Sequence, residues 1–218
     1  MKINLNILIF SAIFSAFTIN ADANFLGKRY VAIGAGVLSP GDDIVNDIDD
    51  SIVTYSANLR YPLNSTYDLL ASFGQAKIDG DMNVYIPNYL SSINTDVDGT
   101  STSIRGGIQF HFRPNDQIDP YIGVGIIWSK FEFDTMYESS DDDDFGIVAG
   151  GGLEININEI FSIGSGLTYQ SEMFDEDDFV GTVSLNIWPT SSFLISVSTD
   201  YSFDSEDLGL TGAIGIGF

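Results

Sequence analysis

The sequence predicts an all-β fold: a closed antiparallel up-and-down transmembrane β-barrel, with ten strands expected and eight as the alternative count. Three observations predict it. Large apolar and small polar residues alternate in short segments, turn-forming residues separate these segments, and acidic residues gather in every second connection. The C-terminal segment LGLTGAIGIGF shows the alternation, with large apolar residues on one face and mostly glycine, alanine and threonine on the other.

The charge balance excludes several partners and chemistries. The 218 residues include 31 acidic and eight basic side chains, which gives a formal net charge of −23. Nucleic-acid binding requires a basic surface, so we expect no nucleic-acid partner. The chain has no cysteine, which excludes disulfides, thiolate catalysis and zinc–thiolate sites.

The N-terminus has the features of a secretory signal peptide. Lys2 precedes an apolar run over residues 7–17, and Ala21-Asp22-Ala23 follows as a small-residue cleavage site. The run is shorter than the ~20 apolar residues that a membrane-spanning helix needs. We therefore expect residues 1–23 to be removed on export and residues 24–218 to form one barrel domain.

Beyond residue 24, two-residue alternation predicts ten strands. Between Val53 and Tyr61, for example, Tyr55 and Leu59 share one face, whereas Ser56 and Arg60 share the other. Most segments have about nine to twelve residues, enough for a tilted strand to cross the hydrocarbon layer of a membrane. The predicted strands are residues 28–38, 52–61, 67–78, 100–112, 120–131, 145–157, 160–170, 179–188, 193–203 and 208–218.

The connections between these segments alternate between two kinds. Those after even-numbered strands are short turns, at residues 62–66, 113–119, 158–159 and 189–192. Those after odd-numbered strands are mostly longer, at residues 39–51, 79–99, 132–144, 171–178 and 204–207, and they hold 24 of the 31 acidic residues and none of the eight basic ones. An antiparallel meander sorts charge in this way because it places every second connection at the same rim.

A lipocalin-like barrel or a β-sandwich would also alternate, but its polar face would cover the exterior. Here the polar face is small and sparse, whereas the apolar face is bulky and bordered by aromatic residues, as a lipid-facing wall is at both membrane interfaces. The predicted belt at the short-turn end is Tyr61, Tyr67, Phe110, Phe112, Tyr121, Phe161, Trp188, Phe193 and Phe218. The predicted belt at the acidic end is Trp128, Phe131, Phe145, Tyr169, Phe179 and Tyr201.

The inward face carries a small set of polar and charged residues among many glycines. Such groups could pair with one another and plug the lumen, or they could line a thin water path. We expect the plug, because buried charges usually find partners. The predicted lumen residues are Arg60, Asp68, Arg105, His111, Glu154 and Asp200.

The signal peptide, the strand IDPYIGVGIIW and the terminal strand ending in Phe218 resemble the small bacterial outer-membrane β-barrels of the OmpA, OmpX and opacity-protein type. The resemblance implies a Gram-negative outer membrane, with lipid and lipopolysaccharide as surroundings and the acidic loops at the cell surface. It also implies that Phe218 is a recognition signal for the barrel-assembly machinery. The expected role is structural, adhesive or another surface interaction, and the alternative is a narrow porin whose acidic mouth favours cations.

Some outer-membrane barrels are enzymes, and the omptin-like proteases and lipid A acylases or deacylases place a histidine towards the outer side. The single histidine of this chain, His111, adjoins a short turn at the opposite end. We therefore expect no enzymatic activity, no catalytic residue and no cofactor.

The run Asp141, Asp142, Asp143 and Asp144 is a candidate for surface cation binding, because clustered carboxylates offer the hard oxygen ligands that calcium prefers. Such a run is more commonly a solvated group of charges, and we predict no specific metal ligand. Divalent cations could still associate diffusely with the acidic rim and bridge it to lipopolysaccharide phosphates.

Overall fold

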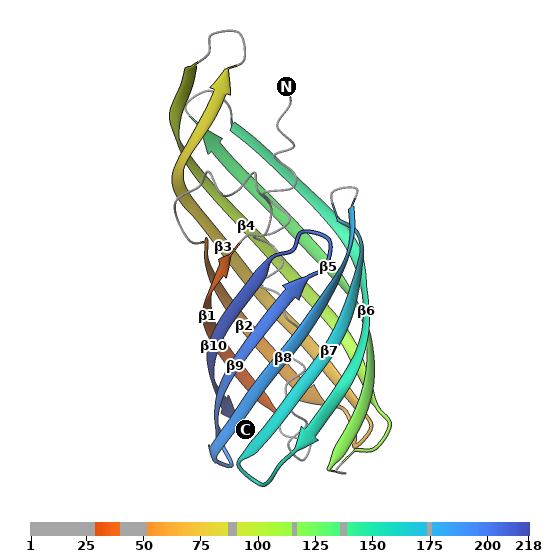
Figure 1. Ribbon diagram of the computed structural model, residues 1–218. Helices are drawn as coiled ribbons and strands as arrows, with labels where there is room; N and C mark the ends of the chain where they lie inside the picture. Colours follow the sequence, from red (N-terminus) through yellow and green to blue (C-terminus); the bar gives the residue numbers. More distant parts are fainter. Residues whose placement is uncertain (1–28, 40–51, 87–90, 115–116, 136–138, 174–175) are drawn as a thin grey trace.

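The computed structural model describes residues 29–39, 52–86, 91–114, 117–135, 139–173 and 176–218. Within this part, ten strands pair antiparallel with their neighbours in sequence, and the first pairs with the last, so that the sheet closes into a barrel (Figure 1). The strands are β1 (Tyr30–Ser39), β2 (Ile52–Pro62), β3 (Tyr67–Ile86), β4 (Ser91–His111), β5 (Ile118–Thr135), β6 (Ser139–Asn156), β7 (Phe161–Met173), β8 (Glu176–Thr190), β9 (Phe193–Ser202) and β10 (Leu208–Gly217). The described residues include no helix that is long and apolar enough to cross a membrane.

The predicted fold class and the count of ten strands are confirmed. Closure is made by β1 and β10, whose register runs from Tyr30 opposite Gly217 to Ser39 opposite Leu208. The predicted signal peptide and most of the connection at residues 39–51 lie outside the described residues.

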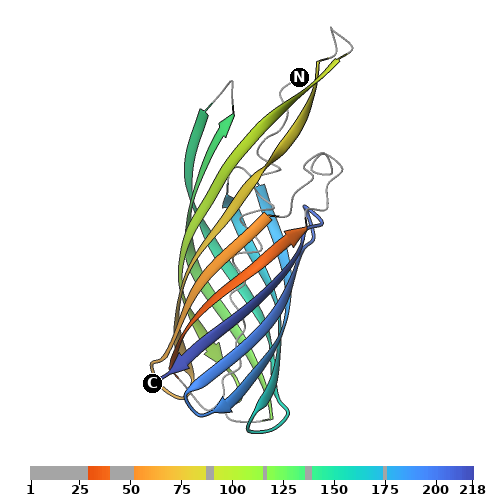
Figure 2. The same ribbon diagram turned by 90° about the vertical axis from the view of Figure 1, so that its left-hand side faces the viewer.

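Two predicted connections are wrong because the strands continue through them, and a third, at residues 171–178, is shortened because β7 runs to Met173 and β8 begins at Glu176. The β3–β4 ladder extends past Ile78 opposite Gly99 to Ile86 opposite Ser91, so residues 79–99 are mostly paired strand. Likewise, the β5–β6 ladder reaches Asp134 opposite Ser139, which places the acidic run at residues 141–144 within β6. Figures 1 and 2 show both hairpins rising above the rest of the barrel, with the β3–β4 hairpin reaching furthest. We call this the long-hairpin end; the opposite end, where the chain terminates, is the short-turn end.

Large apolar side chains cover the outer wall between the two ends. On β5, for example, Ile122, Val124 and Ile126 are 53%, 62% and 65% exposed, while Gly123 and Gly125 alternate with them on the inward side. Aromatic rings meet at both borders of this band. At the short-turn end, the ring centroids of Tyr67 and Phe110 are 5.2 Å apart. At the other border, the ring centroids of Tyr169 and Phe179 are 5.1 Å apart.

Three of the residues assigned to the aromatic belts face the interior instead. Tyr121, Phe131 and Trp188 are 8%, 3% and 2% exposed. The error has a simple geometric cause, since residues an odd number of positions apart on a regular strand point to opposite faces. Trp128 lies on the outer face of β5, so Phe131, three positions later, must point inward.

Substitution of Val124 by arginine should lower the free energy of unfolding by about 2–4 kcal/mol, because the guanidinium would lie in the middle of the lipid-facing band. Ile118 lies on the same strand and face but at the short-turn end, so Ile118→Arg should cost about 0–1 kcal/mol. Urea titration of the protein in lipid vesicles, followed by tryptophan fluorescence, measures both values. Equal costs for the two substitutions would contradict a lipid-facing band.

Candidate functional site

The six lumen residues that the sequence singles out all lie inside the barrel. Each is buried, with exposures between 0% and 3% for Arg60, Asp68, Arg105, His111, Glu154 and Asp200. Their positions follow from parity, because every second residue of each strand points inward. Four of them lie towards the short-turn ends of their strands, where the structure brings several side chains together.

The charged groups at the short-turn end form a network of four residues that we call the floor network: Arg60, Asp68, His111 and Asp119. The Arg60 guanidinium forms an ion pair with Asp68 at 2.5 Å. The ring of His111 lies between two carboxylates, with Nε2 at 3.1 Å from Asp68 Oδ2 and Nδ1 at 2.8 Å from Asp119 Oδ2. All four side chains are buried, so their polar groups contact one another rather than water.

Two short turns build the floor network. Arg60 and Asp68 flank the turn between β2 and β3, where Asn64 Oδ1 accepts hydrogen bonds from the backbone N–H groups of Thr66 and Tyr67. His111 and Asp119 flank the turn between β4 and β5, where the other Asp119 oxygen accepts the N–H of Arg113 at 3.2 Å. Because β3 pairs with β4, these two hairpins lie side by side and their inward side chains meet.

The other side of the floor is apolar. Tyr30, Ala32, Trp188 and Leu194 form a buried cluster from β1, β8 and β9, which we call the floor cluster. The Tyr30 and Trp188 rings meet edge to face, with 5.9 Å between their centroids. Tyr30 is also the cross-strand neighbour of Arg60, so the floor cluster and the floor network adjoin. Together they fill the short-turn end of the lumen with side chains.

Two further interactions join charges of opposite sign inside the barrel. Glu154, the cross-strand neighbour of Asp119, interacts electrostatically with Arg60 of the floor network. Further from the short-turn end, Arg105 interacts electrostatically with Asp200. Both of these interactions join strands that are not neighbours in the barrel.

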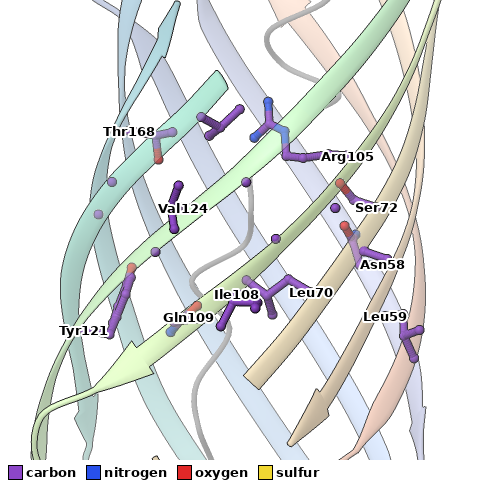
Figure 3. Close-up of a pocket in the computed structure, with 18 of the residues that line it drawn as sticks. Asn58, Leu59, Leu70, Ser72, Arg105, Ile108, Gln109, Tyr121, Val124 and Thr168 are labelled. Atoms are coloured by element: carbon purple, nitrogen blue, oxygen red, sulfur yellow. The ribbon is translucent and has the colours of Figure 1, made fainter. Parts of the chain in front are cut away.

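A cavity of about 60 Å³ lies above the floor, and Figure 3 shows the residues around it. Arg105 is the charged residue among its described lining, which otherwise includes Asn58, Ser72, Gln109 and Thr168. The lining also contains apolar residues and glycines, among them Leu70 and Gly107. The lumen thus contains a small cavity above a side-chain floor.

The acidic run on β6 projects beyond the lipid-facing band. Asp141, Asp142 and Asp143 are exposed, and Asp143 accepts a hydrogen bond from Trp128 Nε1 at 3.1 Å. Lys130, on the neighbouring strand, donates to Glu132, and this hydrogen bond together with nearby aspartate charges raises the pKa of the Lys130 ammonium above its usual value. Within the described ranges, no group of three or more acidic or histidine side chains is arranged to hold a metal ion.

The sequence analysis does not predict two residues of the floor. It places Asp119 in a turn and Trp188 in the lipid-facing aromatic belt. Strand parity could have found Trp188, since Phe179 faces lipid and Trp188 is nine positions away. The pairing of His111 with Asp119 depends on how two hairpins lie against each other, which no local pattern shows.

The closed ten-strand meander, its apolar outer band and its polar filled lumen define a transmembrane β-barrel of the outer-membrane class. Residues 8–203 match the family model described as outer membrane protein beta-barrel domain. The chain therefore belongs to this family and lies in a bacterial outer membrane. A comparison with curated proteins gives no match.

Solved structures similar to this chain are distant in sequence. The translocator domain of the autotransporter NalP from Neisseria meningitidis is 11% identical, with 90% of this chain and 89% of that one covered and a TM-score of 0.52. Ail, the attachment invasion locus protein of Yersinia pestis, solved with the heparin analogue sucrose octasulfate, is 19% identical, with 88% and 97% covered and a TM-score of 0.44. At such identities the likeness concerns the fold alone.

The floor network should respond to substitution as a unit. Arg60→Met or Asp68→Leu alone should each lower the free energy of unfolding by about 3–5 kcal/mol, because each leaves a buried charge without its partner. The double variant should cost less than the sum of the two by about 0.5–3 kcal/mol, because it removes both charges. Urea titrations in vesicles measure this coupling, and strict additivity would contradict the ion pair.

Proposed function

We propose that this protein is a non-conducting outer-membrane barrel whose acidic outer hairpins take part in surface interactions such as adhesion, rather than an enzyme or an open pore. The observation that carries the proposal is the combination of a filled floor with long hairpins outside the membrane. The lumen ends at the floor network and the floor cluster. The β3–β4 hairpin, in contrast, continues well past the outer aromatic border.

The buried site does not favour an enzyme. His111 is held between Asp68 and Asp119 at the periplasmic end, where both ring nitrogens have carboxylate partners. A nucleophile or general base for lipid or peptide hydrolysis would need access to substrate. The histidine is 1% exposed, and its contacts serve the closure of the floor.

The outer surface also suits the surroundings that an outer membrane supplies. Lys77 and Lys130 lie on the outward face of β3 and β5, near the outer aromatic border, where phosphates of lipopolysaccharide would lie. At the other end, the Phe218 ring is 68% exposed, while its N–H donates to the Arg29 carbonyl oxygen at 3.0 Å. A free terminal ring on an anchored backbone is compatible with recognition by the assembly machinery after removal of residues 1–23.

A second candidate function is a narrow cation-preferring porin. It is favoured by the net charge of −23, by the exposed aspartates on β6 and by the cavity beside Arg105. An acidic mouth raises the local concentration of cations and would favour their passage. The two candidates differ in whether ions cross the floor.

Conductance across a planar lipid bilayer distinguishes them. The wild-type protein should give no steady current steps, because side chains fill its periplasmic end. Trp188→Ala combined with Leu194→Ala removes the bulk of the floor cluster and should produce steady steps, which also shows that the barrel has inserted. Steady cation-selective steps from the wild type would support the porin and overturn the closed barrel.

The outer hairpin should be dispensable for the barrel itself. Deletion of residues 79–98 joins Ile78 to its cross-strand partner Gly99 and leaves every pair below them intact. We expect the shortened chain to unfold within about 1 kcal/mol of the wild type, since the deleted pairs lie in water and contact no lipid. The mobility of boiled and unboiled samples on a gel, with urea titration, tests this. A large loss of stability would assign the hairpin a structural role instead.

A further inference from the structure

Beyond the membrane, the barrel continues as an open sheet with two edges. The β5–β6 ladder reaches Ser139, but the β6–β7 ladder begins only at Ile147 opposite Ser171. The β2–β3 ladder likewise ends at Val53 opposite Lys77, while β3 continues to Ile86. Among the described residues, no strand pairs with the outer edge of β6 at 139–146 or of β3 at 78–86. Strands β3 to β6 thus form a projecting antiparallel sheet, and on each side its edge is one that no described strand pairs with (Figure 2).

Backbone direction shows which amides face the free edge of β6. The N–H of Ile147 donates towards β7, to Ser171 Oγ at 3.2 Å. The N–H of Asn156, an even-numbered residue, donates towards β5, to Gln117 O at 2.8 Å. Because N–H directions alternate along a strand, the amides of Asp143 and Phe145 point to the free edge.

Both of these amides are already occupied by carboxylates of the same strand. Asp142 Oδ1 accepts the N–H of Asp143 at 3.0 Å, and Asp144 Oδ1 accepts the N–H of Phe145 at 2.7 Å. We call these two side chains the edge caps. Ionised acceptors make stronger hydrogen bonds than carbonyl groups. An incoming strand would therefore have to replace each carboxylate hydrogen bond with a weaker bond to its own carbonyl oxygen.

We propose that the edge caps prevent this protein from joining to a second copy of itself by strand addition. An unprotected sheet edge is a template for pairing with another chain, and charged side chains are a known means of blocking it. The matching edge is β3 of a neighbouring copy. In one membrane all copies share one orientation, so β6 of one and β3 of the next run antiparallel, as strand pairing favours.

This contact would be heterologous, because different edges of the two copies meet. Heterologous contacts that do not close into a ring produce open chains of molecules. Successive aspartates of the run have different contacts: Asp142 and Asp144 cap the edge, whereas Asp143 accepts a hydrogen bond from Trp128. We therefore expect the two capping hydrogen bonds, rather than the net charge of the run, to block strand addition.

The test compares three variants of the full chain in detergent, with folding checked by gel mobility before and after boiling. D142A/D144A removes both caps and should shift the mass of the protein component, measured by light scattering, from one chain to two or more. D141A/D143A removes the same charge but no cap, and D142N/D144N removes the charge but keeps an oxygen acceptor. Both should remain single chains, as should the wild type.

Further variants separate the remaining explanations. If D142A/D144A does not fold, D142V/D144V, with a residue that favours strands, takes its place and D141V/D143V becomes its control. Deletion of residues 79–98 in the associating variant removes the β3 edge and should restore the single chain. Single chains throughout, or association of the control variants as well, would overturn the proposal, as would a wild type that already associates through β6.

Discussion

The whole structure depends on satisfying backbone amides in a solvent that offers no hydrogen bonds. An unpaired N–H or C=O group in hydrocarbon costs several kcal/mol, so a sheet in lipid has to close. Here β10 returns to β1 over the full length from Tyr30 to Ser39, and no edge remains within the lipid-facing band. Closure then fixes the other features, because it gives every strand one lipid face, which is apolar, and one inward face, which has to be filled.

The filling of the inward face follows from the narrow lumen of a ten-strand barrel. Large side chains fit inside only where their neighbours are small: the ring of Tyr121 lies over Gly152, and a Cβ on that glycine would collide with it. The Tyr121 hydroxyl donates to the carbonyl oxygen of Ser165 at 3.2 Å. Charged groups inside the barrel are retained where they meet a partner of opposite sign, as Arg60 meets Asp68. Steric and electrostatic matching of the described side chains thus produces the floor.

Period-two alternation predicts most of this architecture, because lipid imposes it on every strand. It gave the ten strands and the inward position of Arg60, Asp68, Arg105, His111, Glu154 and Asp200. It could not reveal which of these residues touch, because contact depends on how neighbouring hairpins lie together. It also failed beyond the membrane. Aspartate is rare in strands, so residues 141–144 suggest a loop, yet pairing with β5 holds them in β6 and overrides their low propensity.

The acidic run shows how backbone amides are satisfied in water, outside the membrane. Above the membrane, water can hydrate a free edge, so closure is no longer required and β6 extends past the point where β7 leaves it. An edge in water carries a different danger, since its free amides invite another chain. Asp142 and Asp144 occupy those amides with side-chain oxygens. Neighbouring barrels in one membrane share one orientation, so their sheet edges can meet repeatedly just outside the lipid. Protection of the edge against strand addition is therefore needed most where the sheet leaves the membrane, and Asp142 and Asp144 lie in that part of β6.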